Sequence, residues 1–352
     1  MEREKLIKRI LTVTAISAAA GLLVLFNFIF DSYMLRIVNL AGIYITLALS
    51  LNLIYGFTGL FSLGHAGFMA IGAYTTALLT MSPAQKQMNF FLEPLVPWLA
   101  NVEWSFFPAL MVGGLLAAVT GFLIGAPALK LRDDYLAIAT LGFAEIIRIV
   151  FTNMQSVTNG PLGLKGLPPY TNIWWTWGIA FVSILFMVYL FQGSYGRAFK
   201  AIREDEVAAE AMGINLFRHK MLSFTIGSFM AGVGGGLLGN LMGTIDPLMF
   251  RFLLAFNILL IVVLGGMGSI TGTVISGIVI TVLMEYLRFL DGPMDLLFFK
   301  TDGIPGLRMV IFSIMLMVVI LFFQRGIMGN REFTWDFLFK PDRLKKNNVE
   351  GE

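Results

Sequence analysis

The sequence has no cysteine and only two histidines, His65 and His219, in 352 residues. Without cysteine, disulfides, thiolate metal ligands and cysteine nucleophiles are all excluded. Two histidines leave little material for an imidazole-based metal or catalytic cluster. Charge is also scarce, because 13% of the residues are charged, against roughly 25% in a soluble globular domain. These shortages argue against a water-soluble enzyme.

Apolar residues are abundant instead, at 57% of the chain, with a mean hydropathy of +0.80. The charge-free stretches 37–85 and 252–284 are too long for one crossing of about 20 residues, so each must fold back once. The pattern predicts an all-α polytopic membrane protein with about ten transmembrane helices, although eight spans with re-entrant segments would also fit. The ten lie near 10–30, 37–55, 58–80, 106–128, 135–152, 173–192, 220–243, 252–266, 269–288 and 305–324.

Residues 1–9 hold four cations before an apolar run that continues past the signal-like alanines at 18–20. The run is longer than the apolar region of a signal peptide, so we interpret it as an uncleaved first span with a cytosolic N-terminus. Ten spans then leave the C-terminus inside, and most Lys and Arg fall on inner loops, as the positive-inside rule expects. This spread explains the net charge of +3 without a nucleic-acid partner. The predicted parts are a cytosolic N-terminus (1–9), a transmembrane domain (10–325) and a cytosolic tail (326–352).

Two segments, 56–74 and 265–277, are dense in glycine and other small residues. Small residues let helices approach closely in lipid, and they also allow the interrupted helices that line transporter substrate paths. Both interpretations stay open. His65 in the first segment is either a neutral imidazole bonded to a nearby group or a substrate contact. The candidate path residues are Gly59, Ser62, Gly64, His65, Gly67, Gly266 and Gly268.

Charged residues inside predicted spans are few. Glu145 and Arg148 are three residues apart in the fifth span and therefore share a helix face, and Glu285 and Arg288 repeat the spacing near an outer end. Such pairs should face protein or water, because charge facing lipid is costly. Glu145 and Arg148 form either a proton relay or an ion pair that reaches the membrane interface. For Glu285 and Arg288 the interfacial ion pair is the better interpretation.

One long inner loop, 193–220, breaks the membrane pattern. It is rich in Ala, Glu and Arg, which favour helix, and glycines punctuate both ends. Ala198, Ile202, Ala209 and Met212 fall on one helical arc, although Asp205 intrudes. Four acidic residues suit anionic lipid poorly, so we expect the helix to dock on protein.

Three blocks in this loop carry a family resemblance: 196–198 (Gly-Arg-Ala), 201–204 (Ala-Ile-Arg-Glu) and 208–213 (Ala-Ala-Glu-Ala-Met-Gly). They resemble the cytoplasmic loop of the high-affinity branched-chain amino-acid ABC permeases, M-type subunit, and further similar blocks extend over about 37–325. The resemblance implies a coupling helix that docks on an ATPase. Val207 departs from the broader importer motif, which has Glu there. The implied coupling residues are Arg203, Glu204, Ala208, Ala209 and Gly213.

The resemblance also implies partners: a related H-type permease in a heterodimer, two ABC ATPase subunits, and a periplasmic or lipid-anchored binding protein. The sequence lacks a G-x-x-x-x-G-K-[ST] loop, so ATP and Mg²⁺ are expected on the ATPases and no cofactor on this chain. The predicted function is a permease that carries branched-chain amino acids across a bacterial or archaeal cytoplasmic (inner) membrane. A urea or short-amide permease of the same family is the alternative. An ion-coupled secondary transporter is less well supported, because Glu145 is the one acidic residue predicted well inside a span.

Overall fold

The computed structural model describes residues 2–131, 133–288, 294–296, 299–301, 306–322, 326–329 and 332. It is an all-helical bundle, and five of its described helices are long and apolar enough to cross a membrane. These five begin at Ser32, Phe106, Asp133, Ile173 and Leu216, and shorter apolar helices accompany them. Most of the predicted C-terminal tail, from residue 333 onward, lies outside the described residues.

The centre of the bundle is formed by α2 (Ser32–Asn52), α3 (His65–Thr80), α6 (Phe106–Ala128) and α12 (Leu216–Met242). Glycines let α3, α6 and α12 approach to backbone contact: a Cβ added to Gly72 would lie 1.9 Å from the carbonyl oxygen of Gly232. Around these contacts, Leu47, Met69 and Phe224 are fully buried. Since lipid offers no hydrophobic gain for helix association, this close packing is what holds the centre together.

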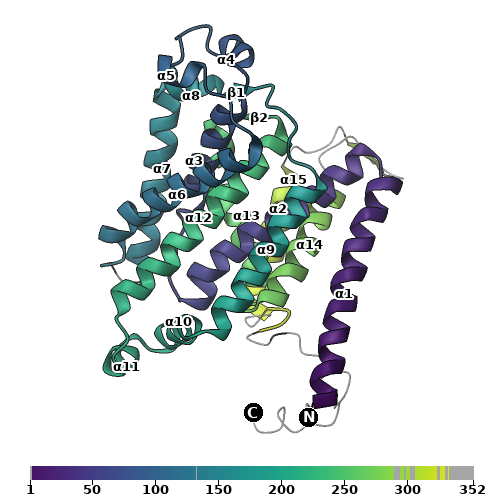
Figure 1. Ribbon diagram of the computed structural model, residues 1–352, viewed down its shortest axis with the longest axis vertical. Helices are drawn as coiled ribbons and strands as arrows, with labels where there is room; N and C mark the ends of the chain where they lie inside the picture. Colours follow the sequence, from purple (N-terminus) through teal and green to yellow (C-terminus); the bar gives the residue numbers. More distant parts are fainter. Residues whose placement is uncertain are drawn as a thin grey trace.

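Six further described helices surround this centre, with α7 on the side opposite α1 (Figure 1). Helix α13 packs on α14, and α14 and α9 each pack on α2. The surrounding helices are α1 (Glu2–Ile29), α7 (Asp133–Asn153), α9 (Ile173–Gln192), α13 (Phe252–Gly265), α14 (Ile270–Tyr286) and α15 (Leu307–Phe322).

Short elements cover one end of the bundle (Figure 1). The Lys86 ammonium, 1% exposed, orders part of this layer by donating to the carbonyl oxygens of Leu99, at 2.9 Å, and Val102. Burial lowers the pKa of Lys86, and the Glu103 carboxylate opposes that shift. The elements are α4 (Pro83–Asn89), α5 (Pro97–Ala100), α8 (Gln155–Thr158), η2 (Gly160–Leu162), η3 (Pro247–Phe250), and β1 (Leu164–Lys165) antiparallel to β2 (Thr244–Ile245). A second hairpin pairs β3 (Met294–Leu296) with β4 (Phe299–Thr301).

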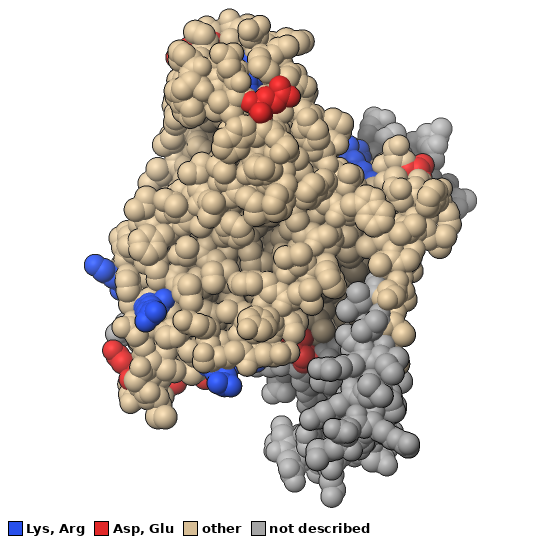
Figure 2. All heavy atoms as spheres, in the orientation of Figure 1, with Lys and Arg blue, Asp and Glu red and all other residues tan. Residues whose placement is uncertain are grey.

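The opposite end carries α10 (Ser194–Glu204) and α11 (Glu206–Ala211), and α1 begins at this end (Figure 1). Figure 2 shows charged side chains gathered towards the two ends of the visible face, with a broad uncharged band between them. An uncharged band bounded by charge is what a protein needs to lie in a bilayer.

Two expected features differ from the structure. The third helix, expected from residue 58, begins at His65, because residues 58–64 form a non-helical segment. The inner loop, expected as one helix, is two helices broken at Asp205. The Asp205 carboxylate accepts from the backbone N–H groups of Val207 and Ala208, so Asp205 is the N-cap of α11. Of the expected apolar arc, Met212 is exposed, whereas Ala198, Ile202 and Ala209 are buried.

Candidate functional site

The first glycine-rich segment begins where α2 ends in a π-helical turn, η1 (Leu53–Phe57). The chain then turns at Gly59, whose φ of +78° suits glycine. The Thr58 hydroxyl holds the segment to α12 through a 2.7 Å hydrogen bond with the Ser223 hydroxyl. π-helical turns are frequent at functional sites. Here the turn ends α2 directly beside the inner loop.

The His65 side chain is 1% exposed at the start of α3. Its Nε2 lies 3.0 Å from the Ser50 hydroxyl on α2, and its Nδ1 has no hydrogen-bond partner within the described part of the chain. A hydroxyl partner is the environment expected for a neutral histidine, and the side chain is enclosed between α2 and α3.

Two other predicted path residues of this segment, Gly64 and Gly67, are packed against α7, whereas Gly59 lies against Arg203 of α10. A Cβ added to Gly64 would lie 2.9 Å from the Thr140 carbonyl oxygen, and one added to Gly67 would lie 3.0 Å from the Ala144 Cα. The Ser62 side chain is 3% exposed. These small residues therefore bring α3 close to one face of α7, and their part in a substrate path stays a prediction.

The second glycine-rich segment is the break between α13 and α14. Gly266 and Gly268 have φ of +109° and +85°, which an L-side chain would rarely adopt. Asn52 on α2 holds this break with three hydrogen bonds: its Oδ1 accepts from the Gly268 N–H at 2.9 Å, and its Nδ2 donates to the Ser269 carbonyl at 3.0 Å and the Thr273 hydroxyl at 2.7 Å. The fully buried Asn52 side chain thus joins α2 to the break.

Arg203, at the end of α10, connects the inner loop to both glycine-rich segments. Its Nη1 donates to the Gly56 carbonyl oxygen at 2.7 Å. The same nitrogen would lie 2.4 Å from a Cβ on Gly268. Its Nη2 pairs with the exposed Glu204 carboxylate at 2.6 Å. We call Arg203, Gly56, Asn52 and Gly268 the inner latch.

The remaining predicted coupling residues lie on and after α11. Ala208 is exposed and Ala209 is 3% exposed, so α11 presents one side outward and packs the other on the protein. Gly213 ends the helix region with φ of +85°. Lys220 at the start of α12 pairs with Glu206 at 2.5 Å and fixes α11 to α12. Between α11, α12 and residues 58–61 lies a polar pocket of about 390 Å³.

Two residues that hold the second break were not foreseen. Asn52 is the clearer one, since an amide inside a charge-free span is unusual and tends to bond across helices. The Glu332 carboxylate accepts from the N–H groups of Ile270 and Thr271, at 2.6 and 3.0 Å, at the N-terminus of α14. A carboxylate is favoured there by the helix dipole, but nothing in the tail sequence signals this partner.

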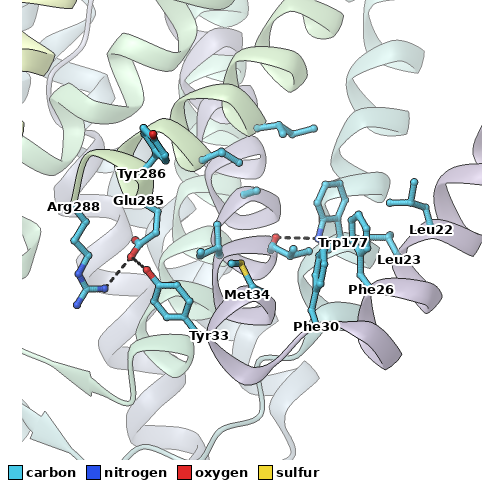
Figure 3. A pocket seen from close by; sticks show the side chains of 15 residues that line it. Leu22, Leu23, Phe26, Phe30, Tyr33, Met34, Trp177, Glu285, Tyr286 and Arg288 are labelled. Carbon is cyan, nitrogen blue, oxygen red and sulfur yellow. Dashed lines mark hydrogen bonds and ion pairs between the residues drawn. The ribbon is translucent and has the colours of Figure 1, made fainter.

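A separate apolar crevice of about 1200 Å³ lies between α1, α2 and α14 (Figure 3). Phe26 lines it from α1, Phe30 from just after α1, and Trp177 from α9. At one end the Tyr33 hydroxyl donates to the Glu285 carboxylate at 2.5 Å, which also pairs with Arg288 at 2.9 Å. None of the predicted path or coupling residues lines this crevice. Within the described ranges, no group of three or more His, Asp or Glu residues is arranged to hold a metal ion.

Comparison with known proteins adds sequence relatives. A family described as "Branched-chain amino acid transport system / permease component" matches residues 33–321. The "High-affinity branched-chain amino acid transport system permease protein LivM" of Escherichia coli K12 is 36% identical over 286 residues, which cover 72% of this chain and 63% of that protein. A "Probable branched-chain amino acid transport permease protein LivM" of Methanocaldococcus jannaschii is 24% identical, over 70% of this chain and 80% of its own length.

A second type of permease is also similar. The LivH permease protein of Salmonella typhimurium, from a high-affinity branched-chain amino acid transport system, is 27% identical over 266 residues, 70% of this chain and 82% of its own length. No solved structure matches the chain. The chain thus spans less than two thirds of the E. coli LivM protein but most of the LivH protein.

Proposed function

The chain belongs to the family of branched-chain amino acid transport permease components, and we propose that it is a pore-forming subunit of an ABC importer for branched-chain, hydrophobic amino acids. The proposed location is the cytoplasmic membrane of a bacterium or archaeon. The observation that carries the proposal is the inner latch, because it ties the one large inner loop to both glycine-rich breaks through Arg203.

In this proposal two ATPase subunits bind ATP and Mg²⁺ and dock on the outward side of α11, around Ala208. Movement of α10 and α11 pulls on the Gly56 carbonyl through the Arg203 guanidinium. Asn52 shares its Oδ1 with the Gly268 N–H, so a shift of the α2 end changes the α13–α14 break as well. Coupling requires an element with two arrangements, and both the loop and the substrate path must shift the equilibrium between them. Ala209 and Gly213 place α11 for this contact, and Glu204 orients Arg203.

The same proposal includes a related H-type permease as the second half of the pore, and a binding protein that delivers the amino acid. It also includes ten spans with both termini inside. In support, α1 begins at the end of the molecule that carries α10 and α11 (Figure 1). The loop and the N-terminus would then share the cytosol, as the positive-inside distribution requires.

The test is uptake into vesicles by the co-purified complex, with its binding protein, using leucine, isoleucine, valine and urea. We expect ATP-dependent uptake of the three amino acids and none of urea. Uptake of urea alone would reassign the substrate to short amides. Uphill uptake by this chain without ATPases would overturn the importer proposal and favour an ion-coupled transporter.

The docking side of α11 is tested with Ala208→Glu, because Ala208 is exposed and a new carboxylate there would be desolvated on docking. We expect loss of ATPase co-purification while the permease itself stays inserted and monodisperse. The matched control is Ala84→Glu, an exposed alanine on α4 at the opposite end. Equal ATPase recovery with both variants would remove α11 from the docking surface.

A further inference from the structure

Helix α7 presents one side to the bundle and leaves the other uncovered. Its inner side contacts α3 through Thr140 and Ala144. Only 22% of its most apolar 18-residue stretch is buried, against 78% for α12. The uncovered side includes Gly142, around which there is open space, flanked by exposed apolar side chains. These are Tyr135, Ile138, Ile146 and Ile149.

An ion pair stands at the border of this uncovered side. Arg148 Nε donates to Glu145 Oε2 at 2.7 Å, and the Arg148 and Glu145 side chains are 23% and 37% exposed. Counted along α7, Glu145 is ~18 Å from Asp133 and ~12 Å from Asn153, at 1.5 Å per residue. A helix of this length spans the ~30 Å hydrocarbon core, so Glu145 lies well inside it, and Arg148 lies three residues closer to the Asn153 end.

The pair keeps unused hydrogen-bonding capacity. The other guanidinium N–H groups and the second carboxylate oxygen have no partner within the described residues. Exposed polar groups at this depth are found facing a water-filled path or another protein chain, because hydrocarbon satisfies none of them. Snorkelling to the interface does not explain Glu145, whose short side chain is far from either helix end.

We propose that the uncovered side of α7 lines the translocation path and that Glu145 and Arg148 bind the zwitterionic head of the amino acid during passage. The substrate ammonium would pair with the Glu145 carboxylate, and the substrate carboxylate with the Arg148 guanidinium. A fork-shaped guanidinium suits a carboxylate, and adjacent opposite charges suit a zwitterion. The open space at Gly142 and the neighbouring isoleucines would receive the aliphatic side chain. This inference rests on the proposed amino-acid import.

The natural absence of cysteine makes water access directly measurable. Single cysteines replace Gly142, Ile146 and Ile149 on α7, and the controls Leu116→Cys and Leu123→Cys lie on the exposed side of α6. The assembled importer in vesicles is treated with a charged methanethiosulfonate, which needs a thiolate and hence water. Modification of this chain is read by mass. We expect the α7 cysteines to react and the α6 cysteines to resist; equal reactivity on both helices would overturn the proposal.

The ion pair is tested with Glu145→Gln and Arg148→Gln. We expect each to lower leucine uptake by about tenfold or more, since removing one partner of a desolvated charge pair has at least that effect on binding. Both variants should still co-purify with the partner subunits, so that a loss of uptake reports on transport and not on assembly. The matched controls are Glu285→Gln and Arg288→Gln, which remove an ion pair of the same spacing at the end of α14; these should preserve uptake.

The outcomes separate this inference from the proposed function. If the unmodified complex takes up no amino acid, the proposed function fails. If it takes up leucine and the Glu145 and Arg148 variants do so equally well, only the α7 assignment fails. Loss of subunit assembly in these variants, with unreactive α7 cysteines, would also overturn it, because the pair would then join protein chains rather than bind substrate.

Discussion

Helices α12 and α7 both run between the two ends of the molecule, yet glycines on them have opposite surroundings. A Cβ on Gly235 of α12 would lie 2.1 Å from the Met69 carbonyl oxygen of α3. A Cβ on Gly142 of α7 would meet nothing within 4 Å. The same residue type therefore closes a helix contact in one place and leaves an open surface in the other.

This difference distinguishes the helix surfaces that hold the fold together from the surface of α7 that is open to other molecules. In lipid, helices associate through close contact and interhelical hydrogen bonds rather than through apolar burial. The α2, α3, α6 and α12 group has both, through its glycines, through the hydrogen bond between Ser50 on α2 and His65 on α3, and through the bond from Thr58 to Ser223 on α12. The small residues on one side of α7 contact α3. Its other side carries the Glu145–Arg148 ion pair, the one charge pair that lies within a described helix of membrane-spanning length.

The largest effect should come from Gly235→Leu on α12. The new side chain collides with backbone of α3, which cannot move without displacing the whole central group, so we expect destabilisation of at least about 3 kcal/mol. Little monodisperse protein should be recovered in detergent, and its thermal midpoint should fall. Gly142→Leu on α7 is the matched control and should purify normally. Equal losses from both substitutions would erase the distinction between the two helices.

How far the sequence predicts these features depends on whether the signal is local. Charge-free stretches predict most of the described helix positions within about five residues, because spanning a bilayer fixes length and polarity. The exceptions are α1, which begins at Glu2 and not at residue 10, and α3, which begins at His65 and not at residue 58. A break in segment 56–74 was one of two interpretations of its glycines, but the helix start expected at residue 58 was wrong, because small residues that interrupt a helix also suit close helix packing. The break at Asp205 had a local signal in the carboxylate that interrupted the apolar arc, and only its role as an N-cap was unrecognised.

The pairing of residues in the inner latch had no local signal. Arg203 and Gly56 are 147 residues apart, and Asn52 and Gly268 are 216 apart. A single sequence predicts the two glycine-rich segments as places where the backbone bends or packs closely, but not that they lie beside each other. Their meeting follows from how α2 packs on α13 and α14, which only the folded chain shows.

Arg203→Ala should give the next largest effect, on transport rather than on folding. It removes the bond from the loop to the Gly56 carbonyl on the buried side of the molecule. A hydrogen bond from a charged group contributes about 1.5–3 kcal/mol, so the loop and α2 should move independently. We expect ATP hydrolysis to continue while amino-acid uptake falls to background. Arg197→Ala, an exposed arginine on the same helix, is the control. Coupled uptake in the Arg203 variant would exclude the latch as the connection.

We expect Asn52→Ala, at a buried amide, to lower stability more than Asn153→Ala, at an exposed one. Asn52→Ala leaves the Gly268 N–H and the Ser269 carbonyl of the break without their amide partner, and interhelical hydrogen bonds in membranes contribute about 0.6–1.7 kcal/mol each. We expect a lower thermal midpoint in detergent, corresponding to a loss of about 1–3 kcal/mol. Asn153→Ala at the end of α7 removes one exposed bond to the Ile149 carbonyl and should change stability little. A larger loss of stability from Asn153→Ala than from Asn52→Ala would contradict this prediction.

The smallest effect should come from Gly142→Ala, which we compare with the same substitution at Gly72. Gly142→Ala adds a methyl group to open space and raises helix propensity, so its stability should be unchanged or higher by up to about 1 kcal/mol. Gly72→Ala gains the same propensity but places its methyl group 1.9 Å from the Gly232 carbonyl oxygen, and it should lower the thermal midpoint. Because the substitution is the same at both positions, opposite changes in stability at Gly142 and Gly72 would separate the effect of packing from that of helix propensity. A shared sign would mean that propensity, and not contact between α3 and α12, decides the stability of these helices.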